Sequence, residues 1–305
     1  MDYILIVAGL IGLFFGGEAL VRGSVGMARR LAMPPLLIGL TVVGFGTSTP
    51  ELLVSIEAAL RGVPDIAVGN IVGSNIANIL LIVGLTSLVW PIRVSGTTLR
   101  RDTAVMLTAA VALVPVFATG EIGRLPGALL VMGLAGYLCW AYLGSGTAPE
   151  DDSDPSASLS LRVSALWIVG GLAVLMLGAR FLVDGSVSIA RGFGVSEAFI
   201  GLTIVAVGTS LPELATSIIA AFRRQSEIAI GNIVGSNIFN VFGILGATAL
   251  IRPVPVADRF LAFDLPIMIA ATLVVTGLLL ARPVIGRPIG LAMLAAYLAY
   301  VTMAQ

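Results

Sequence analysis

Two short polar stretches interrupt the apolar sequence, and each contains a glutamate. GTSTPE begins at Gly46, and GTSLPE begins at Gly208. On a helix, Glu51 lies four positions after Thr47 and three after Ser48, so the three side chains share one face. Pro50 has no N–H for the Gly46 carbonyl, and such a carbonyl can bind a cation where it lines a cavity. Each stretch therefore predicts a cluster of hydroxyl, carbonyl and carboxylate oxygens.

A second repeated stretch adds more oxygen atoms. GNIVGSNIAN carries Ser74 and Asn78, and GNIVGSNIFN carries Ser236 and Asn240. The two members of each pair are one helical turn apart and share a face. The cation-binding side chains that these four stretches predict are Thr47, Ser48, Glu51, Ser74, Asn78, Thr209, Ser210, Glu213, Ser236 and Asn240.

These residue types favour a hard cation, in particular Ca²⁺. Ca²⁺ prefers about six to eight oxygen ligands, whereas zinc, copper and iron favour imidazole or sulfur. The chain has no histidine, and its one cysteine, Cys139, lies in an apolar run. A charge near the bilayer centre costs about 2.5–3.5 kcal/mol, so two glutamates at matching positions indicate binding rather than packing. Glu51 and Glu213 together balance one divalent cation.

Composition indicates the kind of protein that must position these residues. Of its 305 residues, 58% are hydrophobic and 11% are charged, whereas soluble domains have about 45–50% apolar and about 25% charged residues. The apolar runs are continuous and near helix length rather than alternating. The sequence therefore predicts an all-α polytopic membrane protein embedded in the lipid bilayer. Its net charge of zero gives no reason to expect nucleic acid as a partner.

Hydropathy predicts ten transmembrane helices, since about 20 apolar residues cross a bilayer. The expected spans are 3–21, 34–60, 66–90, 103–119, 125–143, 162–182, 196–222, 227–250, 261–281 and 286–303. The second and seventh are longer than a straight span requires, which favours tilted or broken helices. Close helix contact is expected at the GxxxG glycines, which are Gly69, Gly73, Gly231 and Gly235.

The chain consists of two similar halves. When Gly46 is aligned with Gly208, the segment 46–80 matches 208–242 with 22 identities in 35 positions. An odd number of helices per half inserts the second half in the opposite direction, which predicts two inverted five-helix repeats. The expected domains are a first repeat at 1–143, an acidic cytoplasmic linker at 144–161 and a second repeat at 162–305.

The arginines predict the orientation in the membrane. Loops on the side of the amino terminus hold six arginines, and loops on the opposite side hold eleven. The positive-inside rule places the arginine-rich side in the cytoplasm. Both termini are then expected outside.

Other charged residues have simpler explanations. Glu57 lies six positions beyond the first site glutamate and faces another side of the helix, so we expect it at the interface or at a cavity edge. Glu18 and Arg22 are four positions apart and predict an ion pair at a helix end, which could also latch a gate. Their counterparts, Arg180 and Asp184, predict the same pair with the charges exchanged.

The paired motifs resemble the two alpha repeats of the cation/calcium antiporter superfamily. The branch they resemble is the sodium/calcium exchanger group, including its compact prokaryotic members. The resemblance implies a ten-helix inverted repeat that exchanges Ca²⁺ for Na⁺ in a bacterial or archaeal inner or plasma membrane, with the ten side chains above as ligands. It also implies carbonyl ligands one turn before the threonines, at Gly44 and Ala206. The first and sixth helices would slide across an eight-helix body.

Two transport functions remain open at this point. A Na⁺/Ca²⁺ antiporter is favoured, because two states of one acidic site can bind different cations in turn. A Ca²⁺/H⁺ antiporter is the alternative, because the glutamates could carry protons; proton-coupled relatives tend to have a GNxxEH-like signature, where this chain has GNIVGSN. An enzyme is not expected, since no second polar cluster supplies a nucleophile or base. Asn240 departs from relatives with aspartate there, which disfavours potassium coupling.

Overall fold

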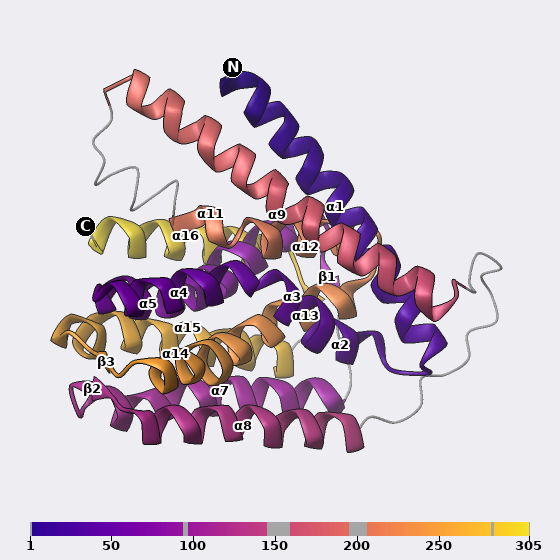
Figure 1. Cartoon of the computed structure of the whole chain (residues 1–305). Coiled ribbons are helices and arrows are strands. Elements are labelled where there is room, and N and C mark those ends of the chain that lie inside the picture. Colours follow the sequence, from indigo (N-terminus) through magenta and orange to yellow (C-terminus); the bar gives the residue numbers. More distant parts are fainter. Residues whose placement is uncertain (1, 94–96, 145–158, 195–205, 282–283, 305) are drawn as a thin grey trace.

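The computed structural model of the protein describes residues 2–93, 97–144, 159–194, 206–281 and 284–304, and helices make up most of it (Figure 1). The first half of the chain forms α1 (Asp2–Arg30), α2 (Pro35–Ile38), η1 (Gly39–Val43), α3 (Gly44–Thr47), α4 (Thr49–Arg61), α5 (Pro64–Ile76), η2 (Ala77–Ile82), α6 (Val83–Val89), β1 (Ile92–Arg93), α7 (Thr97–Phe117), β2 (Glu121–Ile122) and α8 (Arg124–Leu143). The second half forms α9 (Leu161–Gly192), α11 (Ala206–Thr209), α12 (Leu211–Phe222), α13 (Ser226–Ile238), η4 (Phe239–Leu245), α14 (Gly246–Ile251), β3 (Val254–Pro255), η5 (Phe260–Asp264), α15 (Leu265–Ala281), β4 (Val284–Ile285) and α16 (Arg287–Met303).

Helices occupy the ten expected spans wherever the structure describes them; the seventh is described from residue 206 onward. Six of the described helices are long and apolar enough to cross a membrane, and these are α1, Pro64–Val89, α8, α9, Ser226–Ile251 and Phe260–Ala281. A seventh span is added if the bent pair Pro35–Thr47 and Thr49–Arg61 is counted as one. The all-helical, multi-pass membrane fold is confirmed, and the count of ten spans stays a prediction.

The second expected span is a broken helix, as its length predicts. α4 is bent by 43° from the preceding segment Pro35–Thr47. At the break, Ser48 has φ −82° and ψ 10°, and the matching Ser210 has φ −88° and ψ 6°. Pro50 and Pro212 each lie in the first turn of the helix that follows, where a missing N–H is tolerated. Each proline therefore lies at the point where one helix stops and another starts.

The third and eighth expected spans, Pro64–Val89 and Ser226–Ile251, run through the centre of the molecule, and most of their residues are buried. A Cβ on Gly231 would lie 2.6 Å from the Leu36 carbonyl oxygen, and one on Gly235 would lie 2.2 Å from the Leu40 carbonyl oxygen. The close helix contact predicted for this glycine pair is therefore present. For Gly69 and Gly73 it stays a prediction, because among the described residues a Cβ on Gly73 meets nothing within 4 Å.

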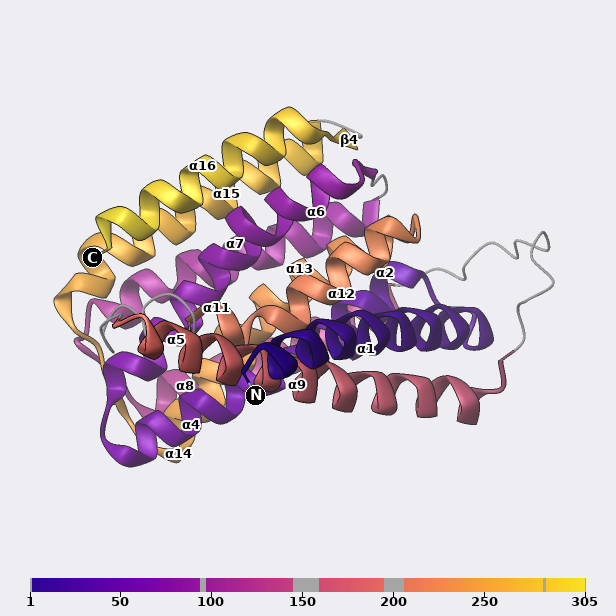
Figure 2. The same ribbon diagram turned by 90° about the horizontal axis from the view of Figure 1, so that it is seen from above.

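Helices α1 and α9 form a separate pair that lies against one side of the other helices, side by side in both views (Figures 1 and 2). Glycines bring their backbones together. A Cβ on Gly171 would lie 2.6 Å from the Leu20 amide nitrogen, and one on Gly178 would lie 2.7 Å from the Leu13 amide nitrogen. Any larger residue at these positions would force the two helices apart.

Four two-residue strands tie the two halves together at their ends. β1 pairs antiparallel with β4, with Ile92 opposite Ile285, and β2 pairs antiparallel with β3, with Ile122 opposite Val254. Each strand from the first half pairs with one from the second half.

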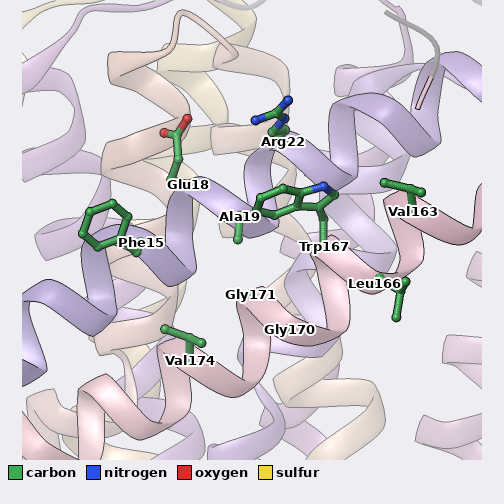
Figure 3. Close-up of a pocket in the computed structure, with 10 residues that line it drawn as sticks. All are labelled: Phe15, Glu18, Ala19, Arg22, Val163, Leu166, Trp167, Gly170, Gly171 and Val174. Carbon is green, nitrogen blue, oxygen red and sulfur yellow. The ribbon is translucent and has the colours of Figure 1, made fainter. Parts of the chain in front are cut away.

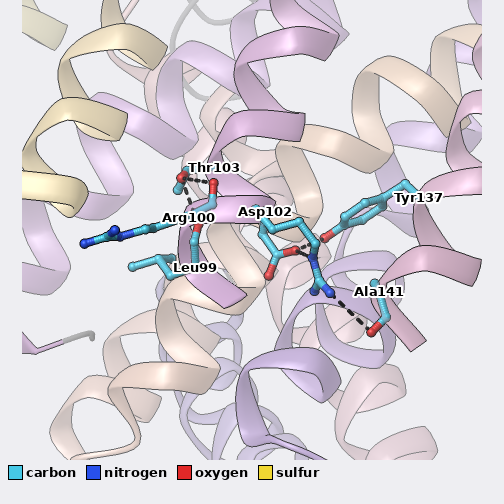
Figure 4. Close-up of polar contacts among 7 residues, drawn as sticks. Leu99, Arg100, Asp102, Thr103, Tyr137 and Ala141 are labelled. Carbon is cyan, nitrogen blue, oxygen red and sulfur yellow. Dashed lines mark hydrogen bonds and ion pairs between the residues drawn. The ribbon is translucent and has the colours of Figure 1, made fainter. Parts of the chain in front are cut away.

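Two buried aspartates, which the sequence analysis did not single out, hold neighbouring helices together. Asp102 on α7 accepts hydrogen bonds from Arg101 Nε at 2.7 Å and from the Tyr137 hydroxyl of α8 at 3.3 Å (Figure 4). Asp264, at the matching position of the second half, accepts a hydrogen bond from the Tyr300 hydroxyl of α16 at 2.9 Å. Its Oδ2 lies 3.4 Å from Arg259 Nε. Burying a carboxylate is costly unless it is paired, so these clusters fix α7 to α8 and η5 to α16.

Candidate cation-binding site

The predicted site residues lie where the two broken helices meet the two central helices. Thr47 and Ser48 lie at the end of α3, and Glu51 lies in the first turn of α4; Ser210 and Glu213 occupy the matching places around α12. Nine of the ten predicted side-chain ligands are at most 5% exposed: Thr47, Ser48, Glu51, Ser74, Asn78, Ser210, Glu213, Ser236 and Asn240. Thr209 is partly buried. The fold therefore buries the polar set that the sequence singled out.

Each glutamate is bonded by the serine of the other half. The Ser48 hydroxyl donates to Glu213 Oε1 at 2.8 Å, and the Ser210 hydroxyl donates to Glu51 Oε1 at 3.4 Å. The Ser210 oxygen is also 3.5 Å from the Ser74 oxygen, so the second pair extends to a central helix. These reciprocal bonds bring the two polar stretches into a single cluster.

The second oxygen of each carboxylate is the most informative feature of the cluster. Oε2 of Glu51 and Oε2 of Glu213 are buried, and neither has a hydrogen-bond partner within the part of the chain that the structure describes. Buried polar atoms are almost always paired, and a buried carboxylate without a counter-charge is strongly unfavourable. These two oxygens are therefore candidate ligand positions for a cation.

The Gly44 carbonyl, implied as a ligand by family resemblance alone, lies in the same cluster. It accepts a hydrogen bond from the Ser236 hydroxyl at 3.1 Å, and Thr47 Oγ1 lies 3.4 Å from it. Ala206 begins α11 at the matching place of the second half. π-helical turns η2 and η4 carry Asn78 and Asn240, and such turns often mark functional positions.

Sequence reasoning missed two asparagines that hold the glutamate segments in place. Asn232 donates to the Glu213 carbonyl oxygen at 3.2 Å and to Ser217 Oγ at 2.9 Å, and it accepts from the Thr47 hydroxyl at 3.0 Å. Asn70 donates to the Glu51 carbonyl oxygen at 3.1 Å and to Ser55 Oγ at 2.9 Å. The sequence did contain a sign of this role, because each asparagine lies one helical turn before the serine of its motif and on the same helix face.

The candidate site contains few charged side chains. Among the described residues, no group of three or more His, Cys, Asp or Glu could hold a metal ion. The cluster instead combines two carboxylates with hydroxyl, amide and carbonyl oxygens, a set that suits Ca²⁺ or Na⁺ rather than a tightly held transition metal.

Two expected features outside the site have different outcomes. The expected Glu18–Arg22 pair is wrong: Arg223, just after α12, binds both carboxylate oxygens of Glu18, at 2.7 and 2.9 Å. The Arg22 guanidinium instead lies 5.1 Å from the centre of the Trp167 ring, beside a groove between α1 and α9 that contains none of the expected ligands (Figure 3). Spacing along α1 could not reveal that the end of α12 packs beside it.

The other charged residues behave as helix-surface pairs. Arg180 and Asp184 form the expected pair, at 3.7 Å, with both side chains exposed. Glu57 is exposed and pairs with Arg61, four positions later, which matches an interfacial position.

Comparison with known proteins places the chain in a family. The family model described as "Sodium/calcium exchanger protein" matches residues 1–143 and 163–304. The chain belongs to the sodium/calcium exchanger family. It is 35% identical to the inner membrane protein YrbG of Escherichia coli, over 98% of this chain and 95% of that protein. It is 32% identical to the sodium/calcium exchanger MaX1 of Methanosarcina acetivorans, over 90% of each.

Solved structures of a family member have the same fold. A structure of the sodium-calcium exchanger NCX_Mj, soaked with zero Na⁺ and Ca²⁺, superposes with a TM-score of 0.87 and 31% identity, over 100% of this chain and 99% of that one. A weaker similarity, 26% identity over 226 residues, relates the chain to the Ca²⁺/H⁺ antiporter ChaA of Bacillus subtilis. The members of this family are transporters rather than enzymes, so this chain is a cation antiporter in a membrane.

Proposed function

We propose that the protein exchanges Ca²⁺ for Na⁺ at the cluster built around Glu51 and Glu213. The observation that carries this proposal is the pair of buried carboxylates, each with one oxygen bonded by a serine of the other half and one oxygen without a described partner. Two negative charges neutralise one Ca²⁺. Three Na⁺ in the same cluster would leave about one positive charge, so exchange at that ratio would be electrogenic.

The proposed cation ligands are those that the sequence indicated. They are Thr47, Ser48, Glu51, Ser74, Asn78, Thr209, Ser210, Glu213, Ser236 and Asn240, with the carbonyl oxygens of Gly44 and Ala206. The burial of nine of these side chains and the Ser236–Gly44 hydrogen bond support the set. Hydroxyl and carbonyl ligands carry no charge, so a cation can leave such a site more easily than one built from carboxylates alone.

We also propose that the ten expected helices form two inverted repeats, 1–143 and 162–305, joined by a cytoplasmic linker, with both termini outside. Reciprocal contacts support the two-fold relation, since Ser48–Glu213 and Ser210–Glu51 exchange places when the two halves are aligned. The pairing of β1 with β4 and of β2 with β3 follows the same rule. In this scheme α1 and α9 slide across the remaining helices, which opens the cluster first to one side of the membrane and then to the other.

A Ca²⁺/H⁺ antiporter is the second candidate, because the similarity to ChaA extends over 67% of this chain. The glutamates could then carry protons in place of Na⁺. The test is Ca²⁺ uptake into proteoliposomes driven by a Na⁺ gradient alone or by a pH gradient alone. We expect uptake with the Na⁺ gradient and little with the pH gradient. The reverse result would favour the second candidate, and uptake in neither case would reject both.

A further inference from the structure

Four buried asparagines lie on the two central helices, two on each, and one of them differs from the rest in its hydrogen bonds. The side chains of Asn75, Asn78, Asn237 and Asn240 are all buried. The amide oxygens of Asn78, Asn237 and Asn240 have no hydrogen-bond partner in the described part of the chain. The amide oxygen of Asn75 is engaged, because it accepts a hydrogen bond from Asn240 Nδ2 at 3.1 Å.

The surroundings of Asn75 fix which way its amide faces. Its Nδ2 lies 3.5 Å from the Asn237 carbonyl oxygen and 3.6 Å from the Met268 sulfur. A backbone carbonyl and a thioether sulfur can accept hydrogen bonds and cannot donate them. The NH₂ group of Asn75 must therefore face these two atoms, and its oxygen must face the opposite way, toward Asn240.

This orientation is passed on to Asn240. Because the Asn75 oxygen can accept but not donate, Asn240 must present its NH₂ group to Asn75. The Asn240 oxygen is then directed away from Asn75, and it is the buried oxygen without a described partner. If the Asn240 amide were flipped, its oxygen would face the Asn75 oxygen. Its NH₂ group, which repels cations, would then occupy the position of the oxygen that has no described partner.

We propose that Asn75 is a positioning residue that selects the oxygen of Asn240, rather than its nitrogen, for the transported cation. The inference rests on the proposed function, in which Asn240 is a ligand. It assigns a role to a residue that does not itself touch the ion. A neutral amide needs a neighbour to fix its orientation, because it has an oxygen at one end and an NH₂ group at the other. The two oxygens of a carboxylate are equivalent.

The counterpart of Asn75 in the second half does not act in this way, so it supplies a matched control. Asn237 donates from its Nδ2 to the Ile233 carbonyl oxygen of its own helix, at 2.7 Å. Its side chain is buried to nearly the same extent as that of Asn75. Replacing Asn237 removes a similar volume from the core without releasing the Asn240 amide.

The test measures equilibrium binding of ⁴⁵Ca²⁺ to purified protein at alkaline pH. We expect Asn75→Ala to weaken Ca²⁺ affinity about tenfold, within the range of coupling between contacting residues, and Asn237→Ala to change it much less. Asn75→Leu, which keeps the volume and also removes the acceptor, should behave as Asn75→Ala does and serves if the alanine variant does not fold.

The decisive comparison repeats Asn75→Ala in an Asn240→Asp background. A carboxylate presents oxygen in either orientation, so we expect the effect of removing Asn75 to fall to about twofold or less. An equal loss in both backgrounds would mean that Asn75 acts through packing, and the inference would be wrong. Unchanged affinity in Asn75→Ala, with binding lost in Glu213→Gln, would also reject it while leaving the proposed function intact. Normal Ca²⁺ binding in Glu213→Gln would reject the proposed function itself.

Discussion

The centre of the molecule and the α1–α9 pair are held together in different ways. At the centre, directional hydrogen bonds join the halves, as in the Asn232–Thr47 and Ser48–Glu213 contacts. Between α1 and α9, the described contacts bring glycines such as Gly171 against the partner backbone. Directional bonds fix one geometry, whereas close glycine packing joins α1 and α9 to each other as a single unit. This difference is consistent with the proposal that the centre binds the cation and that the α1–α9 pair moves.

Removing a carboxylate charge should have the largest effect, and it should act on binding alone. Glu51→Gln or Glu213→Gln keeps the size of the side chain but removes one of the two charges that would neutralise Ca²⁺ at the proposed site. We expect Ca²⁺ uptake into proteoliposomes to fall below detection, while each variant still inserts into the membrane. Asp184→Asn, a charge removal at an exposed pair, is the control and should transport normally. Near-normal uptake in both glutamine variants would rule out the site.

A methyl group added to the α1–α9 interface should act on movement instead. A Cβ on Gly171 would lie 2.6 Å from the Leu20 backbone nitrogen, whereas a Cβ on the adjacent Gly170 meets no described atom within 4 Å. We expect Gly171→Ala to slow Ca²⁺ flux about tenfold, by overpacking the interface, with little change in Ca²⁺ affinity. Gly170→Ala should change neither the Ca²⁺ flux nor the Ca²⁺ affinity. Equal behaviour of the two variants would mean that the close approach of the helices has no part in transport.

Pro50 belongs to the centre of the molecule, in the first turn of α4 just after the break at Ser48. Pro50→Ala restores an N–H that could continue the helix through Ser48. We expect Ca²⁺ affinity to weaken about threefold to tenfold, since the geometry of the Ser48 hydroxyl and its Glu213 bond would change. Thermal stability should be kept. A lower melting temperature at constant affinity would show that Pro50 is structural.

The smallest expected effect is at the ion pair between α1 and the segment after α12. Exposed ion pairs contribute about 0–1 kcal/mol, so Arg223→Gln should change the flux rate by about fivefold at most. Arg180→Gln removes the Arg180–Asp184 pair within one helix and should leave the rate unchanged. If both variants behaved like the parent, the Glu18–Arg223 contact would have no part in moving α1.

The sequence predicted those features that follow from local spacing. Glu51 falls on the face of Thr47 and Ser48 in any helix, and the matching stretch that begins at Gly208 indicated that the two clusters belong together. Contacts between distant helices were beyond such reasoning. The Glu18–Arg223 pair depends on how α1 lies beside α12. Asp102 and Asp264 contact their tyrosines only after α7 has packed against α8 and η5 against α16. Asn70 and Asn232 lay within the repeated motif, but their bonds to the glutamate carbonyls join two helices and depend on how those helices pack.

The central claim is that the two halves build one shared Ca²⁺ site rather than one site each. The most direct measurement is the number of ⁴⁵Ca²⁺ ions bound per chain at saturation, in the parent, in Glu51→Gln and in Glu213→Gln. We predict one ion per chain in the parent and none of comparable affinity in either variant, because both carboxylates contact the same ion. Two ions in the parent, with one kept in each single variant, would contradict the account.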